Sequence, residues 1–193
     1  MSNLMILRSV SFDTSFLLKD KVDINLAIDK LSKDDIDCFV TSTVVSELEN
    51  LRMWDSISKD FYRRAMVRMK KTGAKVIDFK NRLLSDAFGK QCVISMKKYH
   101  GVSEKNIVND CNILVQNLKN GVDLFLSEDF HFTSRITRKV IDEVKNNACS
   151  EFHQMCGETL FSVDASVFNK VYSDGKIDLD LVEKLLLDVR KKG

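Results

Sequence analysis

The sequence predicts an α/β fold in which a central, mainly parallel sheet of about five strands lies between two layers of helices. Two observations support this prediction. Short apolar or alternating runs recur along the chain, and each is followed by a segment with apolar residues at helical spacing. Strands that alternate with helices imply a parallel sheet covered on both faces. The chain has 193 residues, enough for one sizeable core, so we expect a single domain over residues 1–193.

The expected strands are short and apolar. In the first of them, Ser9 and Ser11 alternate with Val10 and Phe12, which is the two-residue period of a strand. Residues 122–127 are apolar enough to lie in the middle of the sheet. The expected strands cover residues 8–13, 37–41, 75–79, 122–127 and 159–163.

The expected helices carry apolar residues three and four positions apart, as Ile24, Ala27, Ile28 and Leu31 illustrate. They cover residues 20–33, 44–53, 58–71, 81–99, 103–119, 133–146, 164–172 and 179–191. Residues 173–175, with the sequence Ser-Asp-Gly, predict a turn. Residues 173–193 are therefore expected to form an extra C-terminal helical extension of the domain.

The composition indicates a globular protein and narrows its possible partners. Hydrophobic residues make up 44% of the chain and the net charge is only +2, so a nucleic-acid partner requires a local basic patch. Most of the five cysteines lie in apolar runs, as reduced core thiols do, which favours a cytoplasmic location. The apolar residues 4–7 are too few for a membrane span, so we expect no membrane association.

Two carboxylates follow expected strands. Asp13 ends the first strand, and Asp129 comes just after the fourth, in the sequence Ser127-Glu128-Asp129. The C-terminal ends of parallel strands form the edge at which α/β proteins bind ligands. A plain alternative for Asp13 is a helix N-cap with no chemical role.

Two further carboxylates lie in expected helices. Glu47 shares the apolar face of Val44 and Leu51, one turn into the helix after the second strand. Asp110 lies at the edge of an apolar helical stripe, where it has poor helix propensity and costs desolvation unless a partner compensates. A metal ion is one such partner, and a salt bridge is the plain alternative for Glu47.

In their order along the chain, these acids resemble the pattern of the PIN-domain nucleases. That family includes the VapC-type toxins and endonucleases of RNA decay and ribosomal RNA processing. The matching motifs, between about residue 9 and residue 172, are Asp13-x-Ser15, Glu47-Leu48, Asp110-x-Asn112 and Ser127-x-Asp129. The segment from Lys59 to Gly101 is longer than a minimal toxin of this family needs, and a helix is added after Tyr172.

The resemblance implies an endoribonuclease that hydrolyses RNA phosphodiester bonds with Mg²⁺ or Mn²⁺. Hard divalent cations prefer carboxylate oxygens, and a cation would relieve the repulsion among converging acids. The implied catalytic and metal-binding residues are Asp13, Glu47, Asp110 and Asp129, with Glu47 binding a second ion or orienting the attacking water. The polar residues expected to hold carboxylates in place are Ser15, Asn112 and Ser127.

An RNA substrate needs cations near its phosphates. Arg135 and Arg138 lie on a helix that is expected to begin beside the acids, and the helix over residues 58–71 offers further cations on one face. Those further cations are Arg64, Arg68 and Lys71. The alternatives are solvated helix faces and, for Arg135 and Arg138, surface ion pairs with Asp142 or Glu143.

Histidines and cysteines near these segments are less informative. His131 lies two residues after Asp129 and could contact a substrate phosphate, although an ordinary loop histidine is the simpler interpretation. Cys149, His153 and Cys156 suggest a metal site, but their spacing lacks a fourth ligand and matches no standard zinc motif.

The main alternative function is a catalytically silent domain of the same fold that binds RNA or a protein partner. The complete set of acids favours the enzyme. A phospho-acceptor receiver fits less well, because it needs two adjacent acids early in the chain, whereas Thr14 and Ser15 follow Asp13. Besides RNA, the partners we expect are an antitoxin-like protein and a second copy of the chain, in a homodimer or higher oligomer.

Overall fold

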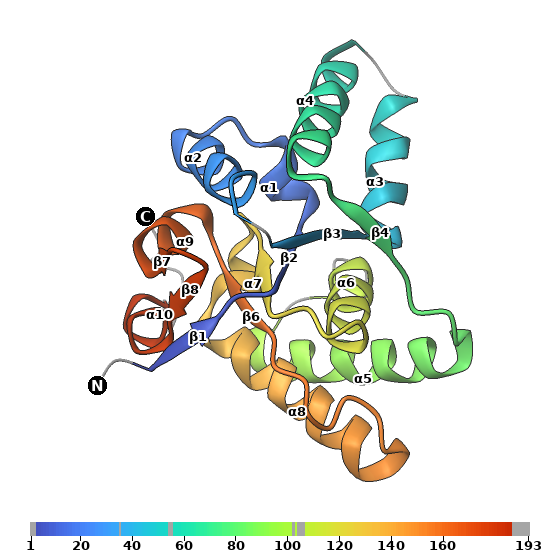
Figure 1. The fold of residues 1–193 in the computed structure, drawn as a ribbon. Coiled ribbons are helices and arrows are strands. Elements are labelled where there is room, and N and C mark those ends of the chain that lie inside the picture. The colour runs from blue at the N-terminus through green and yellow to red at the C-terminus, as the bar shows by residue number, and fades with distance from the viewer. Residues whose placement is uncertain (1–2, 35, 54–55, 102, 104–106, 187–193) are drawn as a thin grey trace.

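A five-stranded parallel sheet lies at the centre of the protein, as a computed structural model shows (Figure 1). The structure describes residues 3–34, 36–53, 56–101, 103 and 107–186. The strand order is β4-β3-β2-β5-β6, and every neighbouring pair is parallel. The strands are β2 (Ser9–Phe12), β3 (Asp37–Thr41), β4 (Lys75–Ile77), β5 (Leu124–Leu126) and β6 (Phe161–Val163). The predicted fold class is therefore confirmed.

Helices cover both faces of this sheet (Figure 1). On one side, α1 packs on α4 and α2 packs on α9. On the other side, α5 packs on both α6 and α8, and α3 joins the two sets by contacting α4 and α6. These helices are α1 (Thr14–Leu18), α2 (Val22–Leu31), α3 (Ser42–Arg52), α4 (Ser56–Thr72), α5 (Arg82–His100), α6 (Val108–Lys119), α8 (Arg135–Phe152) and α9 (Ala165–Val171).

The core explains the patterns in the first and fourth strands. Val10 and Phe12 of β2 are fully buried, and the Phe12 ring stacks on Phe16 of α1 with 5.4 Å between ring centroids. All of β5 is buried, as its continuously apolar sequence predicts for a mid-sheet strand. Phe125 of β5 packs edge-to-face on Phe132, so the turn after β5 is anchored in the core.

A second, antiparallel sheet was not predicted. It has the order β1-β8-β7 and consists of β1 (Leu4–Ile6), β7 (Tyr172–Ser173) and β8 (Lys176–Asp178). The predicted turn at residues 173–175 is present, because Asp174 and Gly175 both have positive φ, at 49° and 76°, as a tight hairpin requires. Strands of two or three residues are too short to show a period, so only their pairing reveals them.

The C-terminal extension begins within this small sheet and continues into a helix. Its helix is α10 (Leu179–Leu185), which Asp178 caps by accepting a hydrogen bond from the backbone N–H of Leu181. The expected helix ran to residue 191, and residues 187–193 lie outside the described part of the chain. Part of the expected helix over residues 103–119 lies outside it too, and α6 begins at Val108.

The cysteines differ from the prediction at one place. Cys149 and Cys156 form a disulfide that joins the last turn of α8 to the loop after it. Both sulfurs are therefore unavailable to the zinc site that their spacing with His153 suggested. The remaining three, Cys38, Cys92 and Cys111, are buried thiols as predicted.

No described helix is both long and apolar enough to cross a membrane.

Arg68 of α4 is a structural residue and not a surface cation. Its side chain lies at a position that is only 5% exposed, and its Nη1 donates to the carbonyl oxygens of Phe16, Leu17 and Lys19 at 3.1, 2.7 and 2.7 Å. Its Nη2 donates to Asn25 Oδ1 at 3.0 Å. The guanidinium thus closes the C-terminal end of α1, and the predicted phosphate-binding role of Arg68 is wrong.

We expect Arg68→Met to lower the free energy of unfolding by about 2–3 kcal/mol, because it leaves several buried carbonyl groups without a donor. Chemical denaturation of the parent and variant measures the change. Arg63→Met is the matched control, since Arg63 is exposed on the same helix. Equal unfolding midpoints for the two variants would show that the contacts of Arg68 do not stabilise the fold.

Candidate active site

The parallel pairing of β2 with β5 brings Asp13 and Asp129 to the same edge of the sheet. Phe12 lies beside Leu126 in this pairing, and the backbone N–H of Asp13 donates to the carbonyl of Leu126 at 2.9 Å. Asp13 is the N-cap of α1, and Asp129 is the N-cap of α7 (Phe130–Thr133). Asp13 thus caps a helix, as its plain alternative predicted, and this capping leaves part of the carboxylate available.

The Asp13 carboxylate is held through one oxygen. Oδ2 accepts hydrogen bonds from the backbone N–H of Ser15 at 3.2 Å, from Ser15 Oγ, and from Ser127 Oγ at 2.9 Å. Oδ1 has no hydrogen-bond partner within the described residues. Burial raises the pKa of Asp13, while the hydrogen bonds from Ser15 and Ser127 lower it. The contacts predicted for Ser15 and Ser127 are therefore present.

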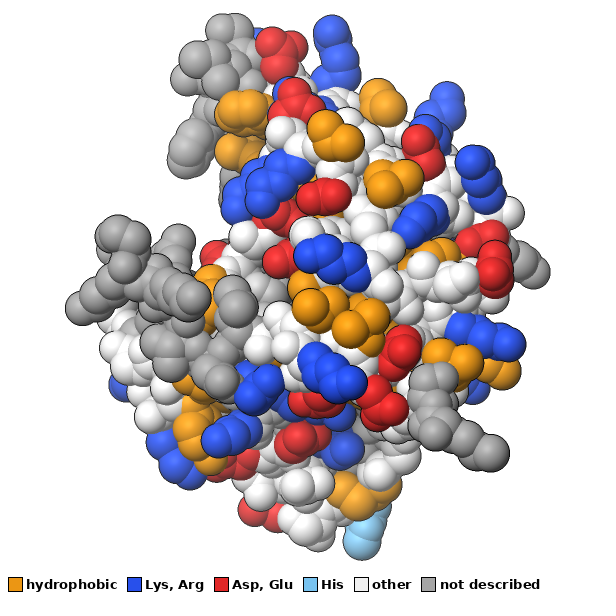
Figure 2. All heavy atoms as spheres, turned by 90° about the vertical axis from the view of Figure 1, so that its left-hand side faces the viewer, with side chains coloured by type: hydrophobic (Ala, Val, Ile, Leu, Met, Phe, Trp, Pro, Cys, Tyr) orange, Lys and Arg blue, Asp and Glu red, His pale blue; other side chains and the backbone are white. Residues whose placement is uncertain are grey.

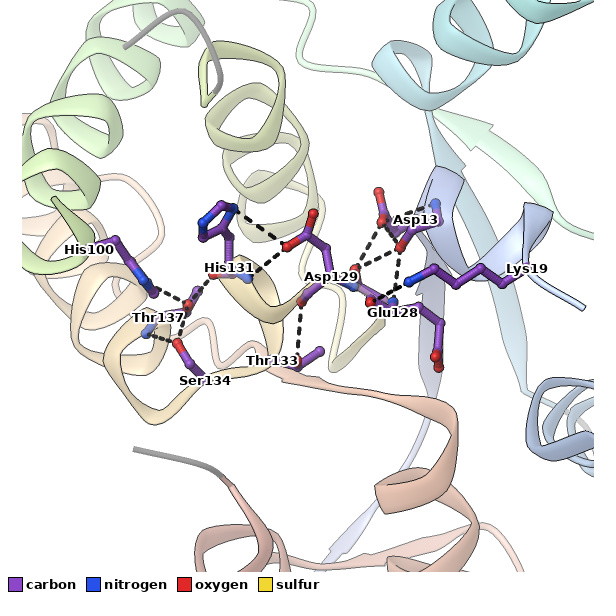
Figure 3. Close-up of polar contacts among 11 residues, drawn as sticks. Asp13, Lys19, His100, Glu128, Asp129, His131, Thr133, Ser134 and Thr137 are labelled. Atoms are coloured by element: carbon purple, nitrogen blue, oxygen red, sulfur yellow. Dashed lines mark hydrogen bonds and ion pairs between the residues drawn. The ribbon is translucent and has the colours of Figure 1, made fainter. Parts of the chain in front are cut away.

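The Asp129 carboxylate follows the same pattern (Figure 3). Its Oδ1 accepts the backbone N–H of His131 at 2.8 Å and lies 3.5 Å from His131 Nδ1. No partner of Oδ2 is found in the described part of the chain. The side chain is 45% exposed, so this second oxygen is accessible. Figure 3 shows Asp129 between His131 and Asp13.

Both oxygens of the Glu47 carboxylate accept hydrogen bonds, unlike those of the strand-end acids. Thr14 Oγ1 donates to its Oε2, and Asn109 Nδ2 donates to its Oε1 at 2.9 Å. The sequence pattern gave no role to Thr14 or Asn109. Thr14 follows Asp13 and Asn109 precedes Asp110 in the sequence, but both donate to Glu47, which belongs to α3.

Asp110 is the acid whose ionisation the site opposes most clearly. The structure gives its side chain no hydrogen bond within the described residues. Burial first, and then the charges of Asp129, Asp13 and Glu47, raise the pKa of Asp110 to about 7. The four predicted acids are thus electrostatic neighbours, although they come from α3, α6 and the ends of β2 and β5.

The donor chemistry of this cluster suits a hard divalent cation, but the arrangement does not form a ligand cage. Asp13 and Asp129 each have one oxygen without a partner in the described part of the protein, and like charges oppose the ionisation of Asp110. Among the described residues, however, there is no group of three or more His, Cys, Asp or Glu side chains that could hold a metal ion. The metal therefore remains a prediction, and binding one would require these carboxylates to approach one another.

Asn112 does not hold a carboxylate as predicted. It lines a pocket of about 460 Å³ between α5 and α6, where its Oδ1 would be 3.0 Å from a Cβ atom placed on Gly89. Two residues along a helix correspond to about 200°, so Asn112 points away from the side of α6 that carries Asp110. The prediction failed because residues two positions apart lie on the same face of a strand but on nearly opposite sides of a helix.

Arg135 and Arg138, which were predicted to border the acids, both contact the C-terminal helix α10. Arg135 Nη2 donates to the carbonyl oxygen of Glu183 at 2.7 Å, which connects α8 to the C-terminal α10. Arg138 lies within ion-pair distance of Asp142 and Glu183, at 3.7 Å each, and its guanidinium stacks 4.0 Å from the centroid of the Phe161 ring. The plain alternative of ion pairing is correct for Arg138, and both arginines fasten the extension to the domain.

The other predicted basic residues are also engaged. Arg64 donates to the carbonyl oxygen of Leu18 at 2.7 Å and lies 3.5 Å from Asp20, while Lys71 pairs with Asp29. On the face drawn in Figure 2, acidic and basic side chains are interspersed and form no single basic patch. The predicted RNA path along α4 thus has little support from this arrangement.

Four contacts near the acids could not be predicted from the sequence. Glu128, between the two matched residues of its motif, accepts from the backbone N–H of Ala165 at 3.0 Å and pairs with Lys21, so it points away from the cluster. Lys19 Nζ reaches the carbonyl oxygen of Glu128 at 2.9 Å (Figure 3). His100 of α5 stacks on His131, with 5.6 Å between ring centroids. Of these residues, the sequence singled out only His131 as a candidate for the site, because it lies two residues after Asp129.

Comparison with known proteins gives a structural likeness at low sequence identity. No protein-family model and no curated protein matches the sequence. The fold is similar to the crystal structure of VapBC2 from Rickettsia felis bound to a DNA fragment from their promoter, with 12% sequence identity and a TM-score of 0.43. The match covers 80% of this chain and 98% of that chain. At this identity and score we base the function of this chain on its own residues.

The raised pKa of Asp110 predicts a pH-dependent effect of Asp110→Asn. The unfolded chain releases the proton near pH 3.8 and the folded chain near pH 7, so the parent loses stability as pH rises between these values. The variant lacks this loss. We expect it to match the parent at pH 3.5 and to be more stable at pH 8, by on the order of 1–2 kcal/mol after solvent screening.

Denaturation in EDTA at a series of pH values measures this difference. Asp86→Asn, at an exposed position on α5, is the control. A difference between parent and Asp110→Asn that stays constant with pH would contradict a raised pKa at Asp110.

Proposed function

We propose that this chain is a Mg²⁺- or Mn²⁺-dependent endoribonuclease of the PIN type, which hydrolyses RNA phosphodiester bonds at Asp13, Glu47, Asp110 and Asp129. One observation carries the proposal. Asp13 and Asp129 are each fixed through one oxygen, and the other oxygen has no partner among the described residues. Both lie near Asp110, whose pKa their charges help to raise. A site that served only to cap helices would have no reason to gather four acids at one sheet edge.

When bound, a divalent cation would activate a water molecule and stabilise charge on the phosphate oxygens. The residues that would hold it are Asp13 and Asp129, through their available oxygens, and Asp110. Ser15 and Ser127 keep the Asp13 carboxylate in one orientation by donating to Oδ2, so that Oδ1 is left for a cation. Glu47, fixed by Thr14 and Asn109, is suited to orienting a water molecule.

Lys19 is the cation we propose for contact with the RNA backbone. It is exposed, and its Nζ donates to the carbonyl oxygen of Glu128, next to Asp129 (Figure 3). A carbonyl acceptor leaves the ammonium charge unneutralised, whereas the ion pairs of Arg138 and Lys71 neutralise theirs. An antitoxin-like protein partner and self-association follow from the PIN resemblance alone, and a cytoplasmic location was inferred from the cysteines in apolar runs. All three remain proposals.

A catalytically silent domain that binds RNA or a protein partner is the second candidate. The observation that favours it is the absence, in the described residues, of any group of three ligands that could hold a metal ion. The two candidates differ in whether metal binds and whether RNA is cleaved, so each can be tested separately.

We expect the parent protein to cleave labelled single-stranded RNA in Mg²⁺ or Mn²⁺ and not in EDTA. Asp13→Asn should reduce the rate at least about 100-fold, because removing one of several groups that act together is severe. Asp164→Asn is the matched control, since Asp164 also follows a strand and caps a helix, where Asn caps equally well. Cleavage by Asp13→Asn at the parent rate would refute the proposed site.

Metal should also raise the melting temperature of the parent, because a ligand that prefers the folded state stabilises it. At a concentration tenfold above the dissociation constant, the gain is about 1.4 kcal/mol. Asp13→Asn should show a smaller gain than Asp164→Asn. An unchanged parent melting curve at about 10 mM Mg²⁺ or Mn²⁺ would favour the silent domain.

A further inference from the structure

A row of contacting side chains connects α5 and α8 to the Asp129 carboxylate (Figure 3). His100, at the end of α5, lies with Nε2 3.1 Å from Thr137 Oγ1 of α8. Thr137 is completely buried and also contacts the carbonyl oxygen of His131. The His131 ring packs edge-on against His100, at an interplanar angle of 81°, and its Nδ1 faces Asp129 Oδ1. None of these contacts was required by the proposed function.

The hydrogen-bond directions in this row are determined by the groups themselves. A carbonyl oxygen can only accept, so the Thr137 hydroxyl donates to His131 O. The same hydroxyl oxygen must then accept from His100, which therefore carries a proton on Nε2. Thr137 thus links the His100 ring to the His131 backbone through two hydrogen bonds. The His131 ring in turn packs against the His100 ring, which these bonds hold in place.

We propose that His131 is a positioning residue for Asp129, with His100 and Thr137 as its support. This inference rests on the proposed function. The backbone N–H of His131 donates to Oδ1 at 2.8 Å, and its Nδ1 lies 3.5 Å from the same oxygen, so Oδ2 is left for the cluster. Without the ring, the carboxylate would be held by one backbone hydrogen bond at the start of the four-residue helix α7.

The positioning is needed because Asp129 is the most exposed of the strand-end acids. Asp13 is buried and held by two serines, whereas the Asp129 side chain is 45% exposed and receives no side-chain hydrogen bond from a serine or threonine in the described residues. An exposed carboxylate samples several rotamers, and a ligand of variable orientation binds a cation less tightly. The imidazole restricts this freedom.

The test compares His131→Ala, His131→Asn and His153→Asn with the parent. Asn can place an amide N–H close to the position of the histidine Nδ1, so it should preserve the contact that Ala removes. His153 is the chain's remaining histidine and is exposed, which makes it the matched control. Mn²⁺ affinity, measured by electron paramagnetic resonance titration of the folded protein, is read separately from kcat and KM for RNA cleavage.

We expect His131→Ala to weaken Mn²⁺ binding and lower kcat by about 10- to 100-fold, with KM unchanged, as for other residues that orient metal ligands. His131→Asn should recover both to within about threefold of the parent. His100→Ala should act in the same direction as His131→Ala and more weakly, and His153→Asn should equal the parent.

Two results would overturn the positioning role. A rise in KM with unchanged Mn²⁺ affinity would show that His131 contacts RNA directly. A lower melting temperature with unchanged Mn²⁺ affinity and kcat would show that it only stabilises the fold. A parent that neither binds Mn²⁺ nor cleaves RNA would refute the proposed function itself, and the positioning role with it.

Discussion

The parallel register between β2 and β5 is the constraint on which the candidate site depends. It places Phe12 beside Leu126, so the next residues along the two strands, Asp13 and Ser127, leave the sheet together. Ser127 then donates to Asp13, and Asp129 begins the short helix that follows. A slip of one residue in this pairing would reverse every side chain and separate the two acids. The packing of β2 opposes such a slip, because it would move Val10 and Phe12 to the face on which the small side chain of Ser11 is buried.

The gathering of acids is unfavourable by itself, and the surrounding residues show how the fold tolerates it. Serine, threonine and asparagine side chains donate to Asp13 and Glu47 and partly replace the water that these carboxylates lose. Asp110 receives no such compensation from the described residues, and its pKa rises to about 7. A carboxyl group that has a raised pKa and lacks hydrogen-bond donors, next to carboxylates that have them, is typical of sites with a chemical role.

The basic residues serve mainly the architecture. Arg68 gathers the carbonyl groups at the end of α1, while Arg135 and Arg138 join α8 to the C-terminal extension. Arginine suits this work because its planar group donates several hydrogen bonds in fixed directions and remains charged when partly buried. In consequence, fewer basic side chains are available to contact a polyanion near the acids than the number of arginines and lysines suggests.

The sequence by itself determined the α/β class, the approximate bounds of most helices and the placement of four acids near one sheet edge. These properties depend on local periodicity and on strand ends, which a few neighbouring residues encode. Tertiary structure decided which oxygen of each carboxylate is held, that Asn112 faces α5, that Cys149 and Cys156 pair, and that residues 4–6 form a strand with residues 176–178. It also decided that His100 supports His131 across the helix interface. These outcomes depend on contacts between segments that are distant in the sequence. The residues that surround a side chain in the sequence do not show which distant residue it will contact.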